Sequence, residues 1–293
     1  MMQSKWFFPA LIAAIGAGIY ANCLHNGFTF DDWPLVVHNP MVIHPDVRAI
    51  FTSAYWPDRP DLGLFRPFTT LTYAINRWIL GEAAFGYHLV NVILHTGNAL
   101  LVLVCLRKFL KASGAMCCAL IFLVHPLQTE AVNSIVGRAE LLAVFCTLGA
   151  WFFLLYGKGY LRWILSATSL FFACLSKEQA AMMLFILALT AYLGRQEGGL
   201  GDTESRQRSS DRMNRFIRES LVGWALCLFA VLFFFWMRFN ALGSLLLPGR
   251  PSFVDNPLAH VGILERWSTA LTVIFDYASL IVWPWGLSAD YSY

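Results

Sequence analysis

Long apolar stretches separated by polar segments run through the chain and predict membrane-crossing helices. A helix that crosses a membrane needs about 20 mostly apolar residues. Five stretches are the clear candidates: 6–24, 87–106, 141–156, 221–239 and 269–285. Shorter stretches add three more: 113–124, 161–175 and 180–193. Because backbone polar groups cannot stay unpaired in lipid, each stretch should be helical. The pattern predicts an all-α, polytopic transmembrane helix bundle of about eight spans, formed by residues 1–293 as one domain.

The composition supports the same class. The chain has 293 residues, of which 58% are hydrophobic and only 13% charged, whereas ordinary soluble domains carry about 25% charge. This excludes a disordered protein, a coiled coil and a typical cytosolic enzyme. The net charge of +3 gives no reason to expect a nucleic-acid partner. Lipid is therefore the expected surroundings of most of the surface, and the first span is expected to be a retained anchor because no cleavage pattern follows it.

The seven cysteines do not form a disulfide pattern. All of them lie within or at the edge of apolar stretches, and no CxxC spacing occurs. Free cysteine is commonly buried as a small apolar residue, so these side chains are expected to pack in the core.

The positions of lysine and arginine predict the orientation in the membrane. With a cytoplasmic amino terminus, the cytoplasmic segments hold twelve basic residues, six of them in the segment 194–220. The opposite side holds nine, mixed with eleven acidic residues in longer loops. We therefore expect a multi-pass protein of the bacterial inner membrane or the endoplasmic reticulum. Segment 194–220, rich in Gly, Ser, Arg and Glu, is expected to be a flexible cytoplasmic linker.

The loop 25–86 is expected to face the periplasm or lumen. It is too long for a simple connection and is dense in proline, aromatic and acidic residues, so it is expected to be ordered and functional. Near its start stand two adjacent carboxylates, Asp31 and Asp32. Two carboxylates side by side in a low dielectric raise one pKa, which suits a general base or a pair of metal ligands. The competing interpretation is a solvated turn before Pro34.

A stripe of polar residues lies within the second predicted span, 87–106. His88, Asn91, His95 and Asn98 are spaced by three, four and three residues and fall within an arc of about 80° on one helix face. Polar groups inside a span usually face the bundle interior or a watery cavity. We expect His88, Asn91 and His95 to line a cavity; the alternative is hydrogen bonding between helices, at about 1 kcal/mol each.

The segment 125–140 carries more polar groups. If it is one helix, Glu130, Asn133, Gly137 and Glu140 share a face, and Glu130 can pair with Arg138. The alternative is a salt-bridged helix lying on the membrane. Lys177 and Arg66 stand at the ends of apolar stretches on the same side, where a lysine can simply snorkel or can neutralise a phosphate. No P-loop, HExxH, GxSxG or dinucleotide fingerprint occurs.

Ordered short motifs extend over nearly the whole chain. They are Phe30-Asp31-Asp32 with Asn39-Pro40, then Phe65-Arg66-Pro67, the run Gly86 to His95, His125-Pro126 with Thr129-Glu130, Val136-Gly137-Arg138-Ala-Glu140, Ser176-Lys177-Glu178 and Asp255-Asn256-Pro257. In this order the chain resembles polytopic glycosyltransferases of the GT-C class, and more closely the transmembrane and tetratricopeptide-repeat-containing O-mannosyltransferases. That family continues into further spans and tetratricopeptide repeats, which this sequence lacks. Because the chain ends at Tyr293 soon after an apolar stretch, a fragment is expected.

The resemblance implies a mannosyltransferase that moves mannose or another hexose from a polyprenyl-phosphate-linked donor to a hydroxyl, expected to be Ser or Thr of an acceptor protein. Asp31 would accept the hydroxyl proton, and Asp32 would orient it or hold a divalent cation. The donor phosphate would be bound by four residues: Arg66, His125, Arg138 and Lys177. The expected cavity-lining residues are His88, Asn91, His95 and Glu130.

Two other functions fit a polytopic protein. A transporter or flippase would use the polar stripe as a path, but it predicts repeated halves, and none is evident. A non-catalytic membrane scaffold of a repeat protein predicts that Asp31, Asp32, His88 and Glu130 lie far apart without a shared cavity.

Overall fold

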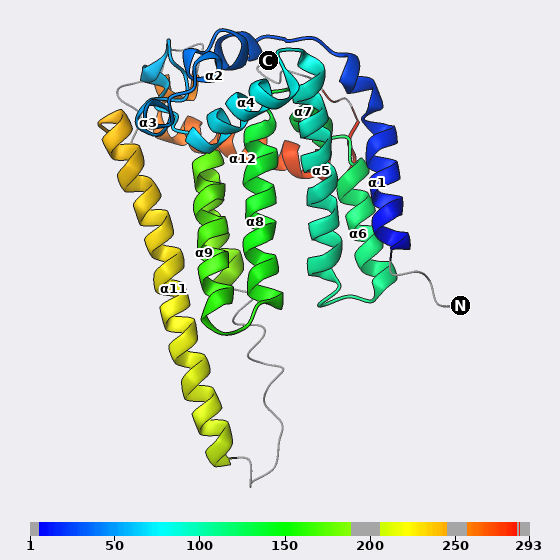
Figure 1. The fold of residues 1–293 in the computed structure, drawn as a ribbon, viewed down its shortest axis with the longest axis vertical. Coiled ribbons are helices and arrows are strands. Elements are labelled where there is room, and N and C mark those ends of the chain that lie inside the picture. Colours follow the sequence, from blue (N-terminus) through cyan, green and yellow to red (C-terminus); the bar gives the residue numbers. More distant parts are fainter. Residues whose placement is uncertain (1–5, 189–205, 245–256, 286, 288–293) are drawn as a thin grey trace.

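The computed structural model describes residues 6–188, 206–244, 257–285 and 287, and every regular element among them is helical. Helices stand side by side along one axis in Figure 1. They are α1 (Phe7–Ile19), α5 (Ala84–Leu106), α6 (Ala112–Val124), α8 (Arg138–Tyr156), α9 (Gly159–Ser176) and α11 (Arg206–Leu242). The expected all-α membrane bundle is confirmed.

Three described helices are long and apolar enough to cross a membrane by themselves. They are α5, α8 and the part of α11 from Ser220 to Leu242. Shorter apolar helices cover Phe7–Ile19, Ala112–Val124 and Glu178–Ala188. The predicted first span is α-helical only to Ile19 and then continues as the short helix η1 (Ala21–His25).

The long loop 25–86 is ordered and forms a helical cap over one end of the bundle (Figure 1). Its elements are η2 (Trp33–Val37), α2 (Pro40–Ile43), α3 (Val47–Thr52), η3 (Pro60–Leu62) and α4 (Pro67–Leu80). Local sequence explains where these helices begin. Asn39 and Asp46 cap α2 and α3 by accepting hydrogen bonds from the N–H groups of Met41 and Arg48. Pro40 and Pro67 occupy first-turn positions, where no N–H is needed.

The described residues form four apolar clusters, of which one joins α1, α5 and α6 and another packs α9 against α11. Ile12, Ala99, Ala119 and Leu123 join α1, α5 and α6. Trp163, Leu170, Cys227 and Phe234 belong to a second core, in which α9 packs against α11. All seven cysteines are free. Cys23, Cys105, Cys174 and Cys227 are buried as expected, whereas Cys118 and Cys146 are partly exposed and Cys117 is exposed, so the expected core packing does not hold for Cys117.

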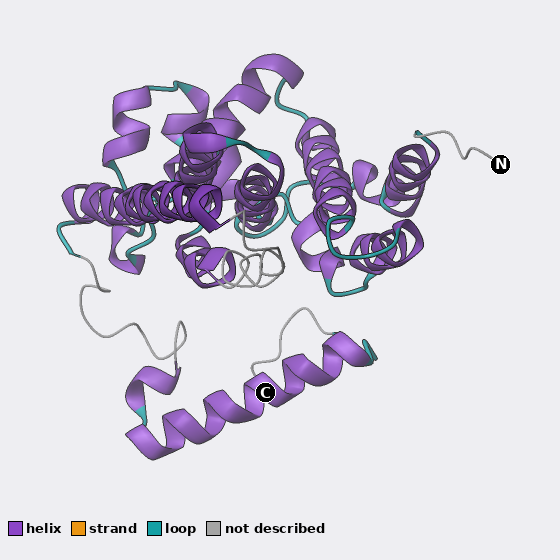
Figure 2. Cartoon of the chain, turned by 90° about the horizontal axis from the view of Figure 1, so that it is seen from below, coloured by secondary structure: helices purple, strands orange, loops and turns teal. Residues whose placement is uncertain are grey.

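Two sequence predictions differ from the structure here. The linker predicted over 194–220 is wrong for 206–220, because α11 begins at Arg206; arginine, glutamine, glutamate and methionine in this part are good helix formers. Residues 194–205 lie outside the described residues. The stretch 269–285 contributes to α12 (Ile263–Val282), but this helix runs across the bundle axis in both views (Figures 1 and 2).

Two connections between the upright helices lie at the same end of the bundle. Figure 1 shows the turns from α5 to α6 and from α8 to α9 at the end of the bundle opposite the cap. These turns contain Arg107, Lys108, Lys111 and Lys158, which the charge pattern placed on one side of the membrane.

Candidate functional site

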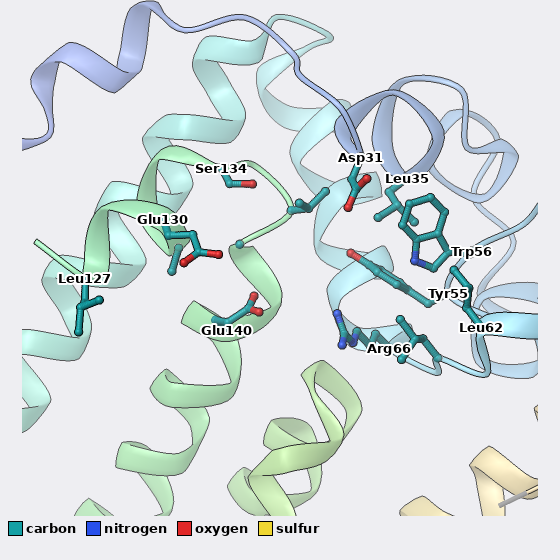
Figure 3. A pocket seen from close by; sticks show the side chains of 14 residues that line it. Asp31, Leu35, Tyr55, Trp56, Leu62, Arg66, Leu127, Glu130, Ser134 and Glu140 are labelled. Atoms are coloured by element: carbon teal, nitrogen blue, oxygen red, sulfur yellow. The ribbon is translucent and has the colours of Figure 1, made fainter. Parts of the chain in front are cut away.

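A pocket of about 470 Å³ lies where the cap meets the bundle. One wall comes from the loop segments around Asp31 and from Tyr55 to Arg66, and the other from α7 (Gln128–Asn133) and the start of α8. Figure 3 shows these two walls facing each other. The lining residues are Asp31, Leu35, Tyr55, Trp56, Leu62, Leu64, Arg66, Leu127, Glu130, Ala131, Ser134, Val136, Gly137 and Glu140.

Carboxylates stand on both walls. Asp31 extends from the cap, whereas Glu130 and Glu140 extend from α7 and α8 (Figure 3). Asp31 and Glu130 are exposed, and within the described residues neither carboxylate has a hydrogen-bond or ion-pair partner. The pocket therefore offers carboxylate oxygens that are free to accept a proton or a hydrogen bond.

A tight turn holds Asp31 at the pocket. The Asp32 carboxylate accepts hydrogen bonds from the Thr29 N–H at 2.8 Å and the Thr29 hydroxyl at 3.3 Å. Its other oxygen accepts from the Val136 N–H at 3.2 Å, across the pocket edge. Phe30 has a positive φ of 38°, a conformation that is uncommon outside glycine. Asp32 thus stabilises the strained turn from both sides.

Asp32 itself is buried, with 1% of its surface exposed. Burial raises the pKa of its carboxyl, while the N–H bonds from Thr29 and Val136 act in the opposite direction. Since both of its oxygens accept hydrogen bonds from the protein, this carboxylate fits a positioning role better than a metal-ligand role. Among the described residues, no group of three His, Cys, Asp or Glu side chains has an arrangement that could hold a metal ion.

Arg66 is the cation that lines the pocket. Its Nε lies 3.5 Å from Glu178 Oε2, and its guanidinium lies 5.2 Å from the centre of the Tyr55 ring. Within the described residues, its two terminal nitrogens have no hydrogen-bond partner. Figure 3 shows the guanidinium beside the open part of the pocket, where it can bind an anion.

Lys177 lies next to the same pocket but is already engaged. Its ammonium group pairs with Glu140, one of the lining carboxylates. The side chain of Lys177 is 18% exposed and that of Glu140 is 40% exposed. An anion that binds Lys177 must therefore compete with this carboxylate.

Arg138, expected to bind the donor phosphate, is instead enclosed in the core. Its Nε donates to Asn91 Oδ1 at 3.0 Å, and Nη2 donates to Asn76 Oδ1 and to the Tyr87 carbonyl, each at 2.9 Å. Nη1 donates to the Thr72 carbonyl at 3.3 Å. The residue is fully buried, and its guanidinium joins α4, α5 and α8. It is committed to protein acceptors and does not line the pocket.

The polar stripe on α5 joins helices and does not line this pocket. Asn91 Nδ2 donates to the Ser134 carbonyl at 2.8 Å, and Asn98 Nδ2 donates to the Leu141 carbonyl at 3.1 Å. His95 Nε2 lies 3.0 Å from the Leu123 carbonyl, and its ring packs against Tyr20. His88 is 1% exposed. The stripe faces the bundle interior, where Asn91, His95 and Asn98 contact backbone carbonyls of neighbouring elements. Within the described residues, the two ring nitrogens of His88 have no hydrogen-bond partner.

His125 also lies away from the pocket lining. Its Nε2 is 2.9 Å from the carbonyl oxygen of Ile281 on α12, and its Nδ1 accepts from the Leu127 N–H. The ring therefore links α12 to the start of α7. The expected phosphate contact of His125 is not supported by this position.

The segment 125–140 is not one helix. α7 ends at Asn133 and α8 begins at Arg138, so Glu130 and Arg138 do not pair. The bend depends on Gly137, where an added Cβ would lie 2.2 Å from the Ala131 carbonyl oxygen; only glycine allows the two backbones to approach this closely. The bend brings Glu130 and Glu140 to the same pocket by a route that a single helix face does not predict.

Tyr55 and Trp56 line the pocket and were not singled out from the sequence. The Tyr55 hydroxyl lies 3.5 Å from that of Tyr73. Burial raises the pKa of Tyr55 to about 12, so this hydroxyl stays protonated at neutral pH. The only signal in the sequence was the density of aromatic residues in the loop 25–86.

The fold and the pocket define a polytopic all-α membrane protein with a candidate active site at one end of its bundle. The chain is a homologue of proteins named protein O-mannosyl-transferases, which confirms the resemblance. It is 31% identical over 302 residues to protein O-mannosyl-transferase Tmtc1 of Drosophila melanogaster, over 95% of this chain and 33% of that protein. A Caenorhabditis elegans protein O-mannosyl-transferase is 31% identical, over 93% of this chain and 37% of the relative.

A third relative matches a shorter part. Mouse protein O-mannosyl-transferase TMTC3 is 36% identical over 154 residues, which is 50% of this chain and 16% of the relative. The chain thus matches between about a sixth and just over a third of the length of these relatives. No family model and no solved structure matches the chain.

Proposed function

We propose that the chain is an integral membrane glycosyltransferase of the GT-C type, which moves mannose or another hexose from a polyprenyl-phosphate donor to a protein hydroxyl. The observation that carries this proposal is the shared pocket of Asp31 and Arg66. An unpaired carboxylate and a cation with free terminal nitrogens are the two groups that such a transfer needs. The names of the homologous proteins support protein O-mannosylation as the activity.

In the proposed reaction, Asp31 accepts the proton of a Ser or Thr hydroxyl as its oxygen attacks the anomeric carbon. The bond from that carbon to the phosphate oxygen breaks, and the lipid phosphate leaves with the bonding electrons. Attack opposite the leaving group inverts the anomeric carbon. Proton transfer by a positioned base accelerates such a step by about 10²–10⁴-fold.

Arg66 is the proposed partner of the leaving phosphate. Negative charge on the phosphate rises as the sugar departs, and a cation in a water-poor site stabilises it strongly. Arg66 and Lys177 differ in availability. The ammonium group of Lys177 is paired with Glu140, whereas Arg66 pairs with Glu178 through Nε and, within the described residues, has no hydrogen-bond partner at its two terminal nitrogens. We assign the phosphate contact first to Arg66, with Lys177 as a second cation released if Glu140 turns away.

The membrane supplies the setting for this reaction. The cap and pocket lie at the end of the bundle that the charge pattern assigns to the periplasm or lumen. The lipid tail of the donor would lie along the apolar helices, and the donor phosphate would lie at the opening of the pocket. A divalent cation, if one takes part, would be coordinated by the donor phosphate. Asp32 is not proposed as its ligand, since both carboxylate oxygens of Asp32 already accept hydrogen bonds.

The scaffold alternative predicts that the candidate residues lie apart. Asp31 and Glu130 instead line one pocket, and Asp32 accepts a hydrogen bond from the N–H of Val136, which lines the pocket wall that carries Glu130. Of the four residues, His88 does not line the pocket. This convergence favours an active site over a passive membrane stem.

Glycopeptide mass spectrometry tests the reaction class. Membranes that contain the chain, supplied with polyprenyl-phosphate mannose and a Ser/Thr-rich acceptor protein, are expected to yield peptides with hexose on Ser or Thr. Membranes without the chain should yield none. Equal hexose in both samples, with the chain present at a normal level, would contradict the proposed function.

Substitution of Arg66 by Gln is expected to raise the KM for the lipid-linked donor. A hydrogen bond to a charged group contributes about 1.5–3 kcal/mol, which corresponds to about a ten- to hundred-fold change in affinity. The measurement is the initial rate of transfer as a function of donor concentration.

Arg59→Gln is the matched control, because Arg59 lies on the same loop and pairs with Asp61 outside the pocket lining. Its donor KM should not change. An unchanged donor KM in Arg66→Gln, with the protein folded, would remove Arg66 from the phosphate site.

A further inference from the structure

Helix α12 has an orientation unlike that of the bundle. It runs crosswise to the other long helices and lies beside the bundle at the level of the cap (Figures 1 and 2). None of its residues from Ile263 to Val282 is buried. Its link to the rest of the described chain includes the contact between His125 Nε2 and the Ile281 carbonyl.

The two sides of α12 differ in chemistry. At 100° per residue, one side of about 120° holds apolar side chains. These include Ile263, Trp267, Leu271, Ile274, Phe275 and Val282. Next to it, a side about 80° wide holds Glu265, Ser268, Thr272, Asp276 and Ser279. The hydroxyls of this side bond to carbonyls within the helix itself.

The apolar side is too exposed for contact with water alone. Trp267 is 65% exposed, Ile274 61% and Phe275 71%. Trp283 and Trp285, just beyond the helix, are 72% and 81% exposed. Contiguous exposed apolar surface of this kind marks a protein or membrane contact, and tryptophan is enriched where hydrocarbon meets the headgroups.

The position of α12 identifies lipid as the partner. The bundle beside it already exposes apolar helix surface, since only 28–39% of each membrane-crossing window is buried. This surface continues towards the cap end, where α12 crosses the axis. A span would run along the bundle and would carry Glu265, Arg266 and Asp276 into hydrocarbon, which is costly.

We propose that α12 is an interfacial helix that lies in the membrane plane on the cap side, with its apolar side in the boundary between headgroups and acyl chains. This would replace the eighth span expected over 269–285. Through His125, the helix would also fix α7, and with it the pocket wall that carries Glu130, at a set height above the lipid. The proposal does not depend on the proposed enzymatic activity.

Cysteine labelling in sealed membrane vesicles tests this placement. Ser268→Cys, Thr272→Cys and Ser279→Cys place thiols on the polar side, and Phe275→Cys places one on the apolar side. A membrane-impermeant maleimide should label all three polar-side variants from the same face of the membrane and leave Phe275→Cys unlabelled. The unchanged chain, with its seven cysteines, gives the background for each variant.

A second measurement distinguishes lipid from protein as the partner that covers the apolar side of α12. Bimane attached to Phe275→Cys in detergent should, after reconstitution, be quenched several-fold more by nitroxide-bearing lipids than bimane on Thr272→Cys. Labelling of Ser268→Cys and Ser279→Cys from opposite faces, or protection of Thr272→Cys, would show a span and overturn the proposal. Protection of Phe275→Cys without lipid quenching would show a protein cover and would also overturn it.

Discussion

Replacement of Asp31 by Asn is expected to lower kcat for sugar transfer by about 10²–10⁴-fold, because a positioned general base contributes that much. Asn keeps the shape of the side chain but cannot accept the proton of the acceptor hydroxyl. Asp31 is exposed and has no partner within the described residues, so the variant should fold and accumulate like the unchanged chain. The measurement is the rate of hexose transfer at saturating donor and acceptor, together with the melting temperature in detergent.

Asp32→Asn is the matched contrast, one residue away. Its carboxylate accepts bonds from Thr29 and Val136, and an amide presents one oxygen and two N–H donors to those N–H groups. An unpaired buried donor costs about 1–3 kcal/mol, so the melting temperature should fall together with activity. Full activity in Asp31→Asn at normal expression would contradict the base assignment. An unchanged melting temperature in Asp32→Asn would contradict its positioning role.

The pattern of apolar and polar residues was sufficient to predict the helix bundle and the ordered loop that forms the cap. Apolar stretches of membrane-crossing length can hardly be anything but helices in lipid, and α5 and α8 occur where they were predicted. The Asp31-Asp32 pair was also found from sequence alone. What sequence could not show is which of the two carboxylates faces the pocket, since that depends on the turn at Phe30 and on Val136, more than a hundred residues away.

The wrong predictions for the Glu130–Arg138 pair and for the phosphate contact of Arg138 share a physical origin in the bend at Gly137. A three-four-three spacing predicts one face only if the helix is continuous. Gly137 instead allows close approach to the Ala131 carbonyl, which separates α7 from α8 and turns Arg138 into the core. The partners of Arg138, which stands on α8, come from two other elements, α4 and α5, and no periodicity within one segment encodes such a contact.

The orientation of α12 was missed for a related reason. Residues 269–285 are mostly apolar in the sequence, but an apolar stretch does not separate a helix that is apolar all round from one with two distinct sides. Helix α12 is not among the described helices that are long and apolar enough to cross a membrane. The polar residues Thr272, Asp276 and Ser279 recur on one side of the helix. This spacing was visible in the sequence and is the signal that distinguishes an interfacial helix from a span.

Replacement of Arg138 by Met is expected to destabilise the folded chain by at least about 3 kcal/mol. It leaves buried acceptors on Asn76, Asn91, Thr72 and Tyr87 without their donor, and each unsatisfied buried group costs about 1–3 kcal/mol. Arg138→Lys should recover only part of this, because an ammonium group cannot reproduce the planar fork of the guanidinium. The measurements are the melting temperature in detergent and the amount of chain in the membrane.

Donor kinetics of the folded fraction separate this role from phosphate binding. If Arg138 only joins α4, α5 and α8, Arg138→Lys should lower the melting temperature and leave the donor KM near that of the unchanged chain. Arg66→Gln should do the opposite, since Arg66 lines the pocket and Arg138 does not. A stable Arg138→Lys chain with a raised donor KM would place Arg138 in the phosphate site and would contradict its structural role. We therefore expect Arg138 to contribute to stability and Arg66 to substrate binding, although both were equal candidates for the phosphate in the sequence.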